Sequence, residues 1–316
     1  MCGTVESVLP SGRPCRPVEV SIVLPCFNSQ RTLAGFLDAL RGQTFSRFEV
    51  VTVDSSPGPE CQAIVRDRYP EVRYERVPER LLPHAARNRG VELARGDLLV
   101  FTDPDVYADP LWLETLVASH RRTGRITAGA IACHGRRWID VGAHLCKFST
   151  WLPGGSLRPV DNAPTVNLLC PRGVFLEIGP FSGDRLLGDT EFSWQARRCG
   201  HVINLEPRAI VVHDHDMSFP RLLEERYRRG VLFGQLRADW YKNRRLRHAV
   251  YLLVSILPIR LTRILALTAA RCWRAGLLRD FVWSAPVVAL GQAASLAGEC
   301  RTYAKRLVGV SAISEG

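Results

Sequence analysis

Segments typical of strands alternate with segments typical of helices over the first two thirds of the chain. The strand segments, in which apolar residues dominate or alternate, are 20–24, 48–53, 72–77 and 98–101. The helical segments between them are 30–41, 59–69 and 83–94. In the first of these helices, four apolar residues share one face: Leu33, Phe36, Leu37 and Leu40. This alternation predicts an α/β fold with a doubly wound, mostly parallel sheet.

The pattern becomes less regular beyond residue 110. Further helices are predicted at 110–122, 172–178 and 189–199, and further strands at 126–133, 202–205 and 209–212. The segment 134–164 is rich in Gly and Pro and contains Trp138 and Trp151. We expect this segment to be an irregular loop that shapes a substrate site.

The last third of the chain is both basic and apolar. Residues 220–248 form a basic helical pattern, and uncharged stretches follow at 249–259 and 281–298. The longer stretch has 18 residues and would measure about 27 Å as a helix, against about 30 Å of membrane hydrocarbon. Pro286 and Gln292 weaken it as a span. Two interpretations remain open, namely one marginal transmembrane helix or in-plane and re-entrant amphipathic helices.

The positive charge is confined to this last third. Residues 221–306 carry 17 Lys and Arg against five Asp and Glu, whereas residues 1–220 carry 25 of each. An anionic membrane surface therefore suits this part better than nucleic acid, which we exclude as a partner. We divide the chain into a loose tail (1–17), a catalytic domain (18–219) and a helical, membrane-associated region (220–316).

Cysteine spacing and the N-terminus indicate the cellular compartment. The ten cysteines include no Cys-x-x-Cys pair, which argues against a zinc knuckle or redox motif. The first 17 residues lack a basic segment followed by an apolar one, so they do not read as a secretory signal. We expect a peripheral, re-entrant or singly spanning protein at the cytoplasmic face of the cell membrane.

Two carboxylates follow one of the predicted strands. Asp103 and Asp105 stand directly after the apolar run 98–102, at the strand end where open α/β sheets bind ligands. Side chains at i and i+2 of an extended backbone point to the same side, so both carboxylates can approach one divalent cation. A cation held there would bind a diphosphate.

Five motifs occur in a fixed order over residues 18–215. They are VSIVLPCFN, FEVVTVDSS, HAARNRGVELARGDLLVFTDPDV, RGVFLEIGPF and LLGDTEFSWQARRCGHVI. In this order they resemble the family 2 glycosyltransferases, enzymes of the GT-A fold. The resemblance implies a nucleotide-sugar donor, a divalent metal (Mg²⁺ or Mn²⁺) and a lipid-linked or other glycan acceptor.

The resemblance also implies a role for individual residues. Those that match the nucleotide-sugar site are Pro25, Phe27, Asn28, Asp54, Arg87, Asn88 and Asp103. Asp105 and His213 match metal contacts, with His215 a weaker candidate. Asp189 matches the general base, and Asn167 and Arg172 fall where the family shapes the acceptor side.

The sequence departs from the family pattern at two positions. Ser55 follows Asp54 where a second acid or an Asn is usual, so the nucleotide base stays open. Gly188 replaces the first acid of the catalytic pair and leaves Asp189 as the base. The Gln-x-x-Arg-Trp signature of processive members is absent, which favours addition of a single sugar.

We therefore predict an inverting glycosyltransferase of the cell envelope that acts at the membrane. Two alternatives remain: a nucleotidyltransferase, which also combines an α/β sheet with metal-binding carboxylates, and a degenerate glycosyltransferase that serves as a membrane scaffold. The sugar, the acceptor and the oligomeric state are not determined by the sequence.

Overall fold

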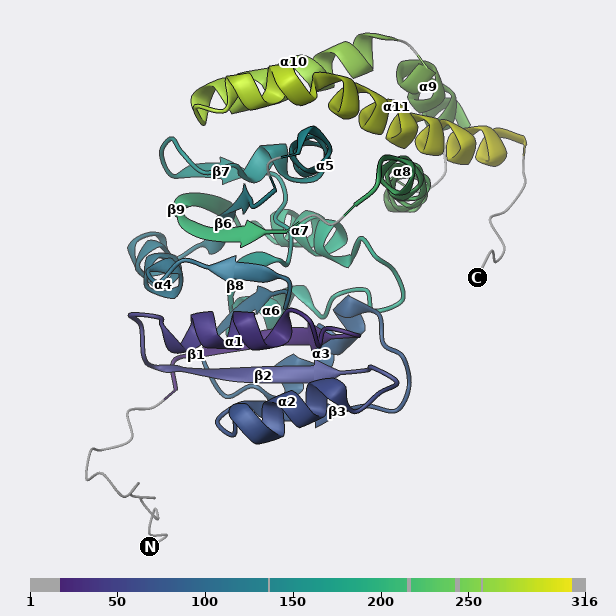
Figure 1. Cartoon of the computed structure of the whole chain (residues 1–316). Helices are drawn as coiled ribbons and strands as arrows, with labels where there is room; N and C mark the ends of the chain where they lie inside the picture. Colours follow the sequence, from purple (N-terminus) through teal and green to yellow (C-terminus); the bar gives the residue numbers. More distant parts are fainter. Residues whose placement is uncertain (1–17, 136, 215–216, 242–244, 257, 309–316) are drawn as a thin grey trace, which may run out of the picture.

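A computed structural model gives the arrangement of residues 18–308 except 136, 215–216, 242–244 and 257 (Figure 1). The predicted tail at 1–17 and the candidate ligand His215 lie outside these described residues. The helices are α1 Leu33–Arg41, α2 Glu60–Arg68, α3 Pro83–Leu93, α4 Trp112–Thr123, α5 Trp138–Phe148, α6 Arg172–Ile178, α7 Gly188–Arg198, α8 Phe219–Trp240, α9 Arg245–Ile256, α10 Pro258–Arg274 and α11 Leu278–Val308.

One mixed sheet forms the centre of the protein. Its strands are β1 Val20–Cys26, β2 Phe48–Asp54, β3 Arg73–Arg76, β4 Leu98–Thr102, β5 Val106–Ala108, β6 Ile126–Cys133, β7 Arg158–Val160, β8 Asn167–Pro171 and β9 Ile203–His213. Within the described residues the order is β3-β2-β1-β4-β8-β6-β9-β5, with β7 paired to β9. The β3-β2-β1-β4 half is parallel, and β8 runs antiparallel between β4 and β6. The predicted α/β class with a mostly parallel sheet is confirmed.

Helices cover both faces of the sheet. Alternate residues of β1 point to opposite faces, so Ile22 belongs to one hydrophobic cluster and Val23 to the other. The first cluster includes apolar residues of α1, α2 and α4, such as Phe36 and Trp112. The second includes residues of α3, α6 and α7, such as Phe192. The carboxyl ends of β1 and β4 therefore open between two helical layers, which is where the candidate site lies.

The segment 134–164 differs from the sequence-based expectation. We predicted an irregular loop, but residues 138–148 form helix α5, followed by a 3₁₀ turn at Ser149–Trp151 and strand β7. Helix α5 packs on α8 and α11: Ile139 and Ala143 share a cluster with Leu222 and Val287. Because these partners lie at least 79 residues later in the chain, the local pattern does not reveal the helix.

Strands near the end of the catalytic part also differ from the prediction. The sequence reading missed β5 and β8, and it divided β9 into two strands. The pairing of β6 with β9 shifts register between Gly129 and Ala130, where β9 bulges, and the strand continues through the irregularity. A bulge of this kind looks like a strand end in the sequence.

Helices α8–α11, residues 219–308, form what we call the C-terminal arm (Figure 1). Helix α11 crosses α8 closely, because a Cβ on Gly230 would lie 1.9 Å from the Ser295 carbonyl oxygen, and a Cβ on Gly298 would lie 2.2 Å from that of Tyr227. By length and composition, Leu278–Leu307 is the one single helix of the described chain able to cross a membrane, and 39% of its apolar window is buried. Helices α9 and α10 meet the same criterion only together, as a bent pair.

Candidate active site

A cavity of about 470 Å³ opens at the carboxyl ends of β1 and β4. Its polar lining includes four residues of the motifs, Arg87, Asp103, Asp105 and Asp189, together with Arg229 of α8. The apolar lining comes from the loop after β1, the segment before α3 and the side chain of Phe148. The structure thus brings the predicted donor, metal and base residues to one place.

Arg87 and Asp103 form an ion pair on the floor of this cavity. Arg87 lies on α3 with 2% of its side chain exposed, and its guanidinium donates to the Asp103 carboxylate directly after β4. The Nε atom of Arg87 is buried and has no partner among the described residues. A buried guanidinium with a spare donor is suited to binding a phosphate oxygen of a donor.

Asp105 and His213 lie together at the edge of the same cavity. Strands β5 and β9 pair Val106 with His213, which brings His213 Nε2 to 3.8 Å from Asp105 Oδ2. The Nδ1 atom of His213 lies 2.7 Å from the Asp214 carbonyl oxygen. If Nδ1 carries the proton, Nε2 presents a lone pair toward Asp105.

These two side chains fit a divalent cation. The Asp105 Oδ1 atom is buried without a hydrogen-bond partner in the described chain, and burial together with neighbouring Asp103 raises the pKa of Asp105. No group of three or more His, Cys, Asp or Glu residues among the described residues is arranged to hold a metal. A cation here would have two protein ligands, with diphosphate oxygens and water completing the shell, as is common for Mg²⁺.

Asp189 lies in the first turn of α7 and lines the cavity. Its Oδ1 atom accepts a hydrogen bond from the Thr190 N–H at 2.7 Å, which fixes the carboxylate. Asp189 also lines a smaller adjoining cavity of about 160 Å³ with Lys147, Trp151 and Arg229. The carboxylate therefore lies where two hollows meet.

The structure explains the missing acid at position 188. A Cβ on Gly188 would lie 2.8 Å from His84 Cδ2 and 2.9 Å from the Ser182 carbonyl oxygen. His84, near the start of α3, occupies this space and is almost fully buried. It contacts the ring of Phe181. Burial and the nearby Arg87 lower the pKa of His84 to about 4, so the imidazole is neutral at physiological pH.

The loop after β1 is tied to the loop after β2. Asn28 has a left-handed backbone, with φ of 53°, and its N–H donates to Ser56 Oγ at 2.8 Å. Ser56 in turn donates to Asp54, which also accepts from the Tyr74 hydroxyl. Asp54 is fully buried and does not line the cavity, whereas Phe27 does, beneath the guanidinium of Arg80 at 4.5 Å. Ser56 thus connects Asp54 to the cavity-lining loop.

Three further predicted residues lie away from the cavity lining. Asn88 exchanges two hydrogen bonds with the backbone of Phe181. Asn167 is fully buried in β8 and bonds the Trp112 indole and two strand carbonyls, so the expected acceptor-side position is wrong. Arg172 donates to the carbonyls of Gly96 and Val91, and it also has no place on the acceptor side. Each fixes the scaffold around the site.

Several residues of the site were missed by sequence reasoning. His84, Arg80 and Phe148 line the main cavity, and Arg229 of α8 lines both cavities. The sequence signal for His84 is indirect: a glycine in the catalytic pair indicates that another side chain fills the space. Arg229 is one of many arginines in a basic helix, and only the fold distinguishes it.

Known proteins share this sequence and fold. Residues 21–170 match the model of Glycosyl transferase family 2. Glycosyltransferase AglE of Haloferax volcanii is 27% identical over 250 residues, which are 76% of this chain and 81% of AglE. The pre-mycofactocin glycosyltransferase of Mycobacterium tuberculosis is 26% identical over 217 residues, 65% of this chain and 44% of that longer protein.

A solved structure shows the same fold. The crystal structure of GalNAc-T7 with UDP, GalNAc and Mn²⁺ aligns with a TM-score of 0.52 and 18% sequence identity, over 67% of this chain and 47% of that chain. At this identity the likeness concerns the fold alone. With its family match over residues 21–170, its named relatives and this GT-A architecture, the chain is a glycosyltransferase that contains a family 2 domain.

Proposed function

We propose that this glycosyltransferase moves a single sugar from a nucleotide-diphosphate sugar to a lipid-linked or envelope glycan acceptor, with inversion at the anomeric carbon. The observation that carries the proposal is that Asp103, Asp105 and Asp189 line one cavity of about 470 Å³. Asp103 and Asp105, which would act on the diphosphate through Arg87 and a cation, thus lie around the same space as Asp189, which would act on the acceptor. A single in-line displacement between them inverts the sugar.

The donor side of the cavity binds and orients the nucleotide sugar. The ring of Phe27, 38% exposed beneath Arg80, offers a stacking surface for the base. Arg87, anchored by Asp103, faces the diphosphate with its unpaired Nε. A divalent cation at Asp105 and His213 would neutralise the charge that develops on the leaving diphosphate. Because Ser55 replaces the usual second acid after Asp54, the preferred nucleotide base is to be determined by experiment.

Asp189 is suited to deprotonate the acceptor hydroxyl. It lies at the junction of the donor cavity with the smaller one lined by Trp151, Lys147 and Glu225, which we assign to the acceptor. Burial lowers the pKa of Lys147, which pairs with Glu225 at 2.7 Å. An aromatic ring beside paired charges is suited to binding a sugar or its phosphate.

The reaction products test the proposal. With a nucleotide sugar and a lipid-linked acceptor, we expect release of UDP or GDP, whereas release of pyrophosphate would identify a nucleotidyltransferase. Asp189→Asn should lower kcat by about 10²- to 10⁴-fold with an unchanged donor Kd, because a base acts in the transition state. The matched control is Glu191→Gln, since Glu191 accepts from Ser182 and lines neither cavity. If Glu191→Gln is inactive while Asp189→Asn is active, the assignment of Asp189 as the general base is wrong.

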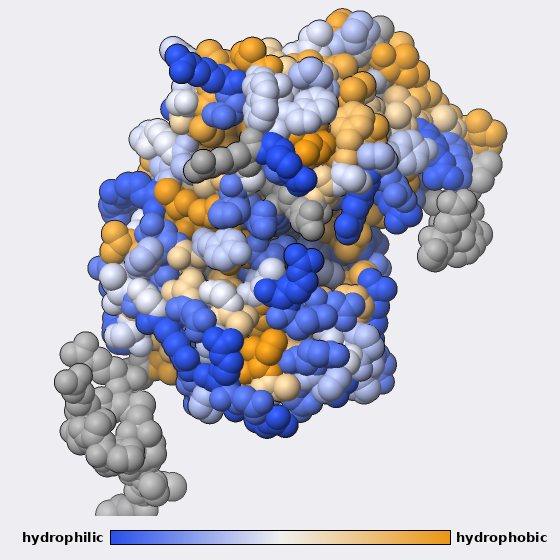
Figure 2. Space-filling model, viewed as in Figure 1, coloured by the Kyte–Doolittle hydropathy of each residue, from blue (hydrophilic) through white to orange (hydrophobic). Residues whose placement is uncertain are grey.

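The arm supports attachment to a membrane in the plane of its surface. Of the 21 large apolar side chains that are exposed in the described chain, 14 lie at or after Tyr241. Figure 2 shows apolar residues gathered over α9–α11 at the top of the view, beside hydrophilic ones. Because α11 is packed against α8 by its glycines, we assign the lipid contact to the outer faces of α9 and α10 and to the first turns of α11. The excess of basic residues in the arm favours attachment at the cytoplasmic face.

Flotation of the full chain with anionic vesicles tests this attachment. Ile256→Glu/Ile259→Glu changes two side chains of the α9–α10 corner, 65% and 69% exposed, and should weaken vesicle binding strongly. The control is Leu111→Glu/Leu176→Glu, which places equal charge on exposed positions before α4 and on α6. Equal loss in both variants would show that charge alone, and not the arm surface, decides binding.

A further inference from the structure

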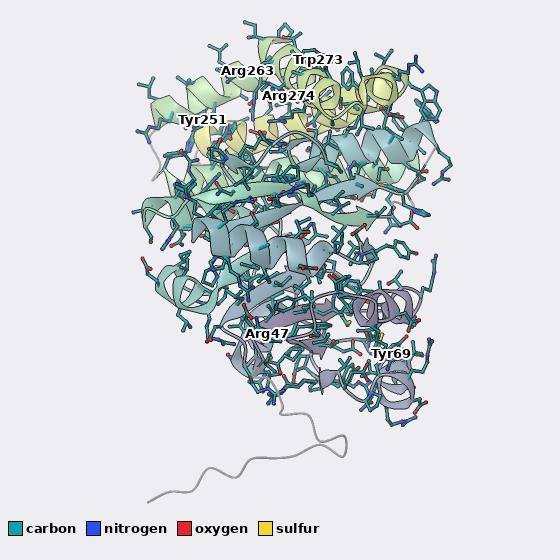
Figure 3. The ribbon with its side chains drawn as sticks, turned by 90° about the vertical axis from the view of Figure 1, so that its left-hand side faces the viewer. Arg47, Tyr69, Tyr251, Arg263, Trp273 and Arg274 are labelled. Atoms are coloured by element: carbon teal, nitrogen blue, oxygen red, sulfur yellow. The ribbon has the colours of Figure 1, made fainter. Side chains whose placement is uncertain are left out.

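A separate cavity of about 550 Å³ lies between the end of α10 and the segment 149–162, which holds the 3₁₀ turn, a glycine-containing loop and β7. Its lining contains three arginines from two parts of the chain: Arg158, just after the loop's glycines, and Arg271 and Arg274 on the last turn of α10. Figure 3 shows Arg274 with Trp273 on α10, at the end of the molecule far from Arg47 and Tyr69. We call these three residues the arginine cluster.

The arginine cluster has no carboxylate of its own. Its hydrogen bonds within the described chain are long and go to neutral oxygens: Arg158 to the carbonyls of Gly154 and Ser156, and Arg271 to Ser149 Oγ, all at 3.4 Å. One acid, Asp161, also lines the cavity, but it is paired with Arg197 at 2.9 Å. Three positive charges therefore line the hollow, and the one carboxylate in its described lining is paired with an arginine outside the cluster.

The loop is shaped to hold this arrangement. Gly154 and Gly155 have left-handed backbones, with φ of 96° and 77°. A Cβ on Gly154 would lie 3.4 Å from Ala275 Cα, so the loop packs against the end of α10. Burial and neighbouring Arg274 lower the pKa of Arg158, as expected where like charges approach. A bound anion would relieve this repulsion.

We infer that the arginine cluster binds the phosphate or diphosphate group of a lipid. Guanidinium groups converging from two elements match the oxygens of a phosphate group. A lipid is the source that the surroundings favour, because Leu267 lines the cavity and exposed apolar residues flank it, among them Trp273 at 70% exposure and Leu278. The lipid chains would follow these side chains while the phosphate enters the cavity.

The site is distinct from the catalytic cavity but adjoins its acceptor side. Asn162 lines both this cavity and the smaller one that contains Asp189. The Trp151 indole, which lines the smaller cavity, donates to the Asn162 carbonyl at 3.0 Å. Both a bilayer phospholipid and a lipid-linked acceptor carry the phosphate chemistry that the cluster would recognise. Binding is independent of turnover, so it is tested without a donor.

The experiment compares two double variants of the full chain. Arg271→Gln/Arg274→Gln removes two members of the cluster, and Arg263→Gln/Arg279→Gln removes two exposed arginines of the same arm. Both lose the same charge, and circular dichroism verifies that both are folded. Three probes are used: phosphatidylglycerol vesicles, phosphatidylcholine vesicles that contain a polyprenyl diphosphate at equal surface charge, and soluble pyrophosphate.

We expect the cluster variant to bind one or both kinds of vesicle about tenfold more weakly than the control variant. The reason is that the cluster variant loses charge-assisted hydrogen bonds in addition to charge. A difference confined to polyprenyl diphosphate identifies the acceptor as the source, and a difference on both vesicles identifies the bilayer phospholipid. Equal binding by the two variants on every vesicle would overturn the inference. So would a difference seen with soluble pyrophosphate alone, because the ligand would then not be a lipid.

Discussion

Gly188 and His84 should prove energetically coupled. An alanine at position 188 would place its Cβ 2.8 Å and 3.0 Å from two His84 ring carbons and 2.9 Å from the Ser182 carbonyl oxygen. Carbon atoms in ordinary contact are about 3.5–4.0 Å apart, so the new atom overlaps its neighbours by roughly half an ångström or more. Overpacking of this kind costs about 1–3 kcal/mol, while Gly→Ala in a helix returns at most about 1 kcal/mol. We expect Gly188→Ala to lower the free energy of unfolding by about 1–2 kcal/mol.

A double-mutant cycle with His84→Ala tests the cause. His84→Ala removes two of the three close contacts and leaves the one with the Ser182 carbonyl, so part of the Gly188→Ala cost should disappear and part should persist. A coupling of about 1 kcal/mol in urea denaturation would support this reasoning. Gly173→Ala is the control, because its Cβ would meet nothing within 4 Å and the change should stabilise α6. If Gly188→Ala is as stable as Gly173→Ala, the proposed exclusion of a side chain by His84 is wrong.

Three further predictions concern the donor site and its surroundings. Ser56→Ala, which removes the link between Asn28 and Asp54, should destabilise the protein by about 1–3 kcal/mol in urea denaturation and weaken UDP or GDP binding in calorimetry. Asp105→Ala should abolish the Mn²⁺-dependent part of nucleotide-sugar affinity; titrations with and without Mn²⁺ check this, and unchanged metal dependence would contradict it. Because the folded-state pKa of His84 is about 4 against 6.5 for a free histidine, the contribution of His84 to stability is complete above about pH 6.5 and is lost as the pH falls toward 4. The stability difference between wild type and His84→Asn, measured by denaturation across this range, should shrink as the pH falls.

The sequence predicted those parts of the fold that depend on local pattern. The alternation up to residue 133 predicted the parallel half of the sheet and its helices, because β1, β2 and β4 are apolar runs and a helical pattern separates each strand of this half from the next. It missed α5, whose buried face packs on helices that follow much later in the chain. The same limit applies to the site: Asp103, Asp105 and Asp189 are visible in motifs, whereas His84 and Arg229 reach the cavity only through the packing of α3 and α8.

The same limit explains why some predicted site residues prove to lie away from the cavity. Asn167 stands in a motif region and carries an amide suited to ligands, yet its amide is fully used by Trp112 and two strand carbonyls. No local pattern distinguishes an amide inside a sheet from one that faces a cleft, because strand β8 is only five residues long and inserts antiparallel between distant strands. Burial decides between the two roles, and burial depends on the whole fold.

The packing of the C-terminal arm links membrane attachment to catalysis. Arg229 of α8 lines both catalytic cavities, and the next residue, Gly230, allows α11 to approach within backbone contact. Glu299 of α11 is buried and accepts from Arg260 of α10 at 2.8 Å, while Arg237 of α8 lies 3.5 Å away, so this carboxylate connects α10 with α8 and α11. In the proposed attachment, a bilayer bound to α9 and α10 would therefore be held at a fixed position relative to Asp189. An acceptor anchored by its lipid chains would approach the base in a restricted orientation, which reduces the entropy lost on reaching the transition state.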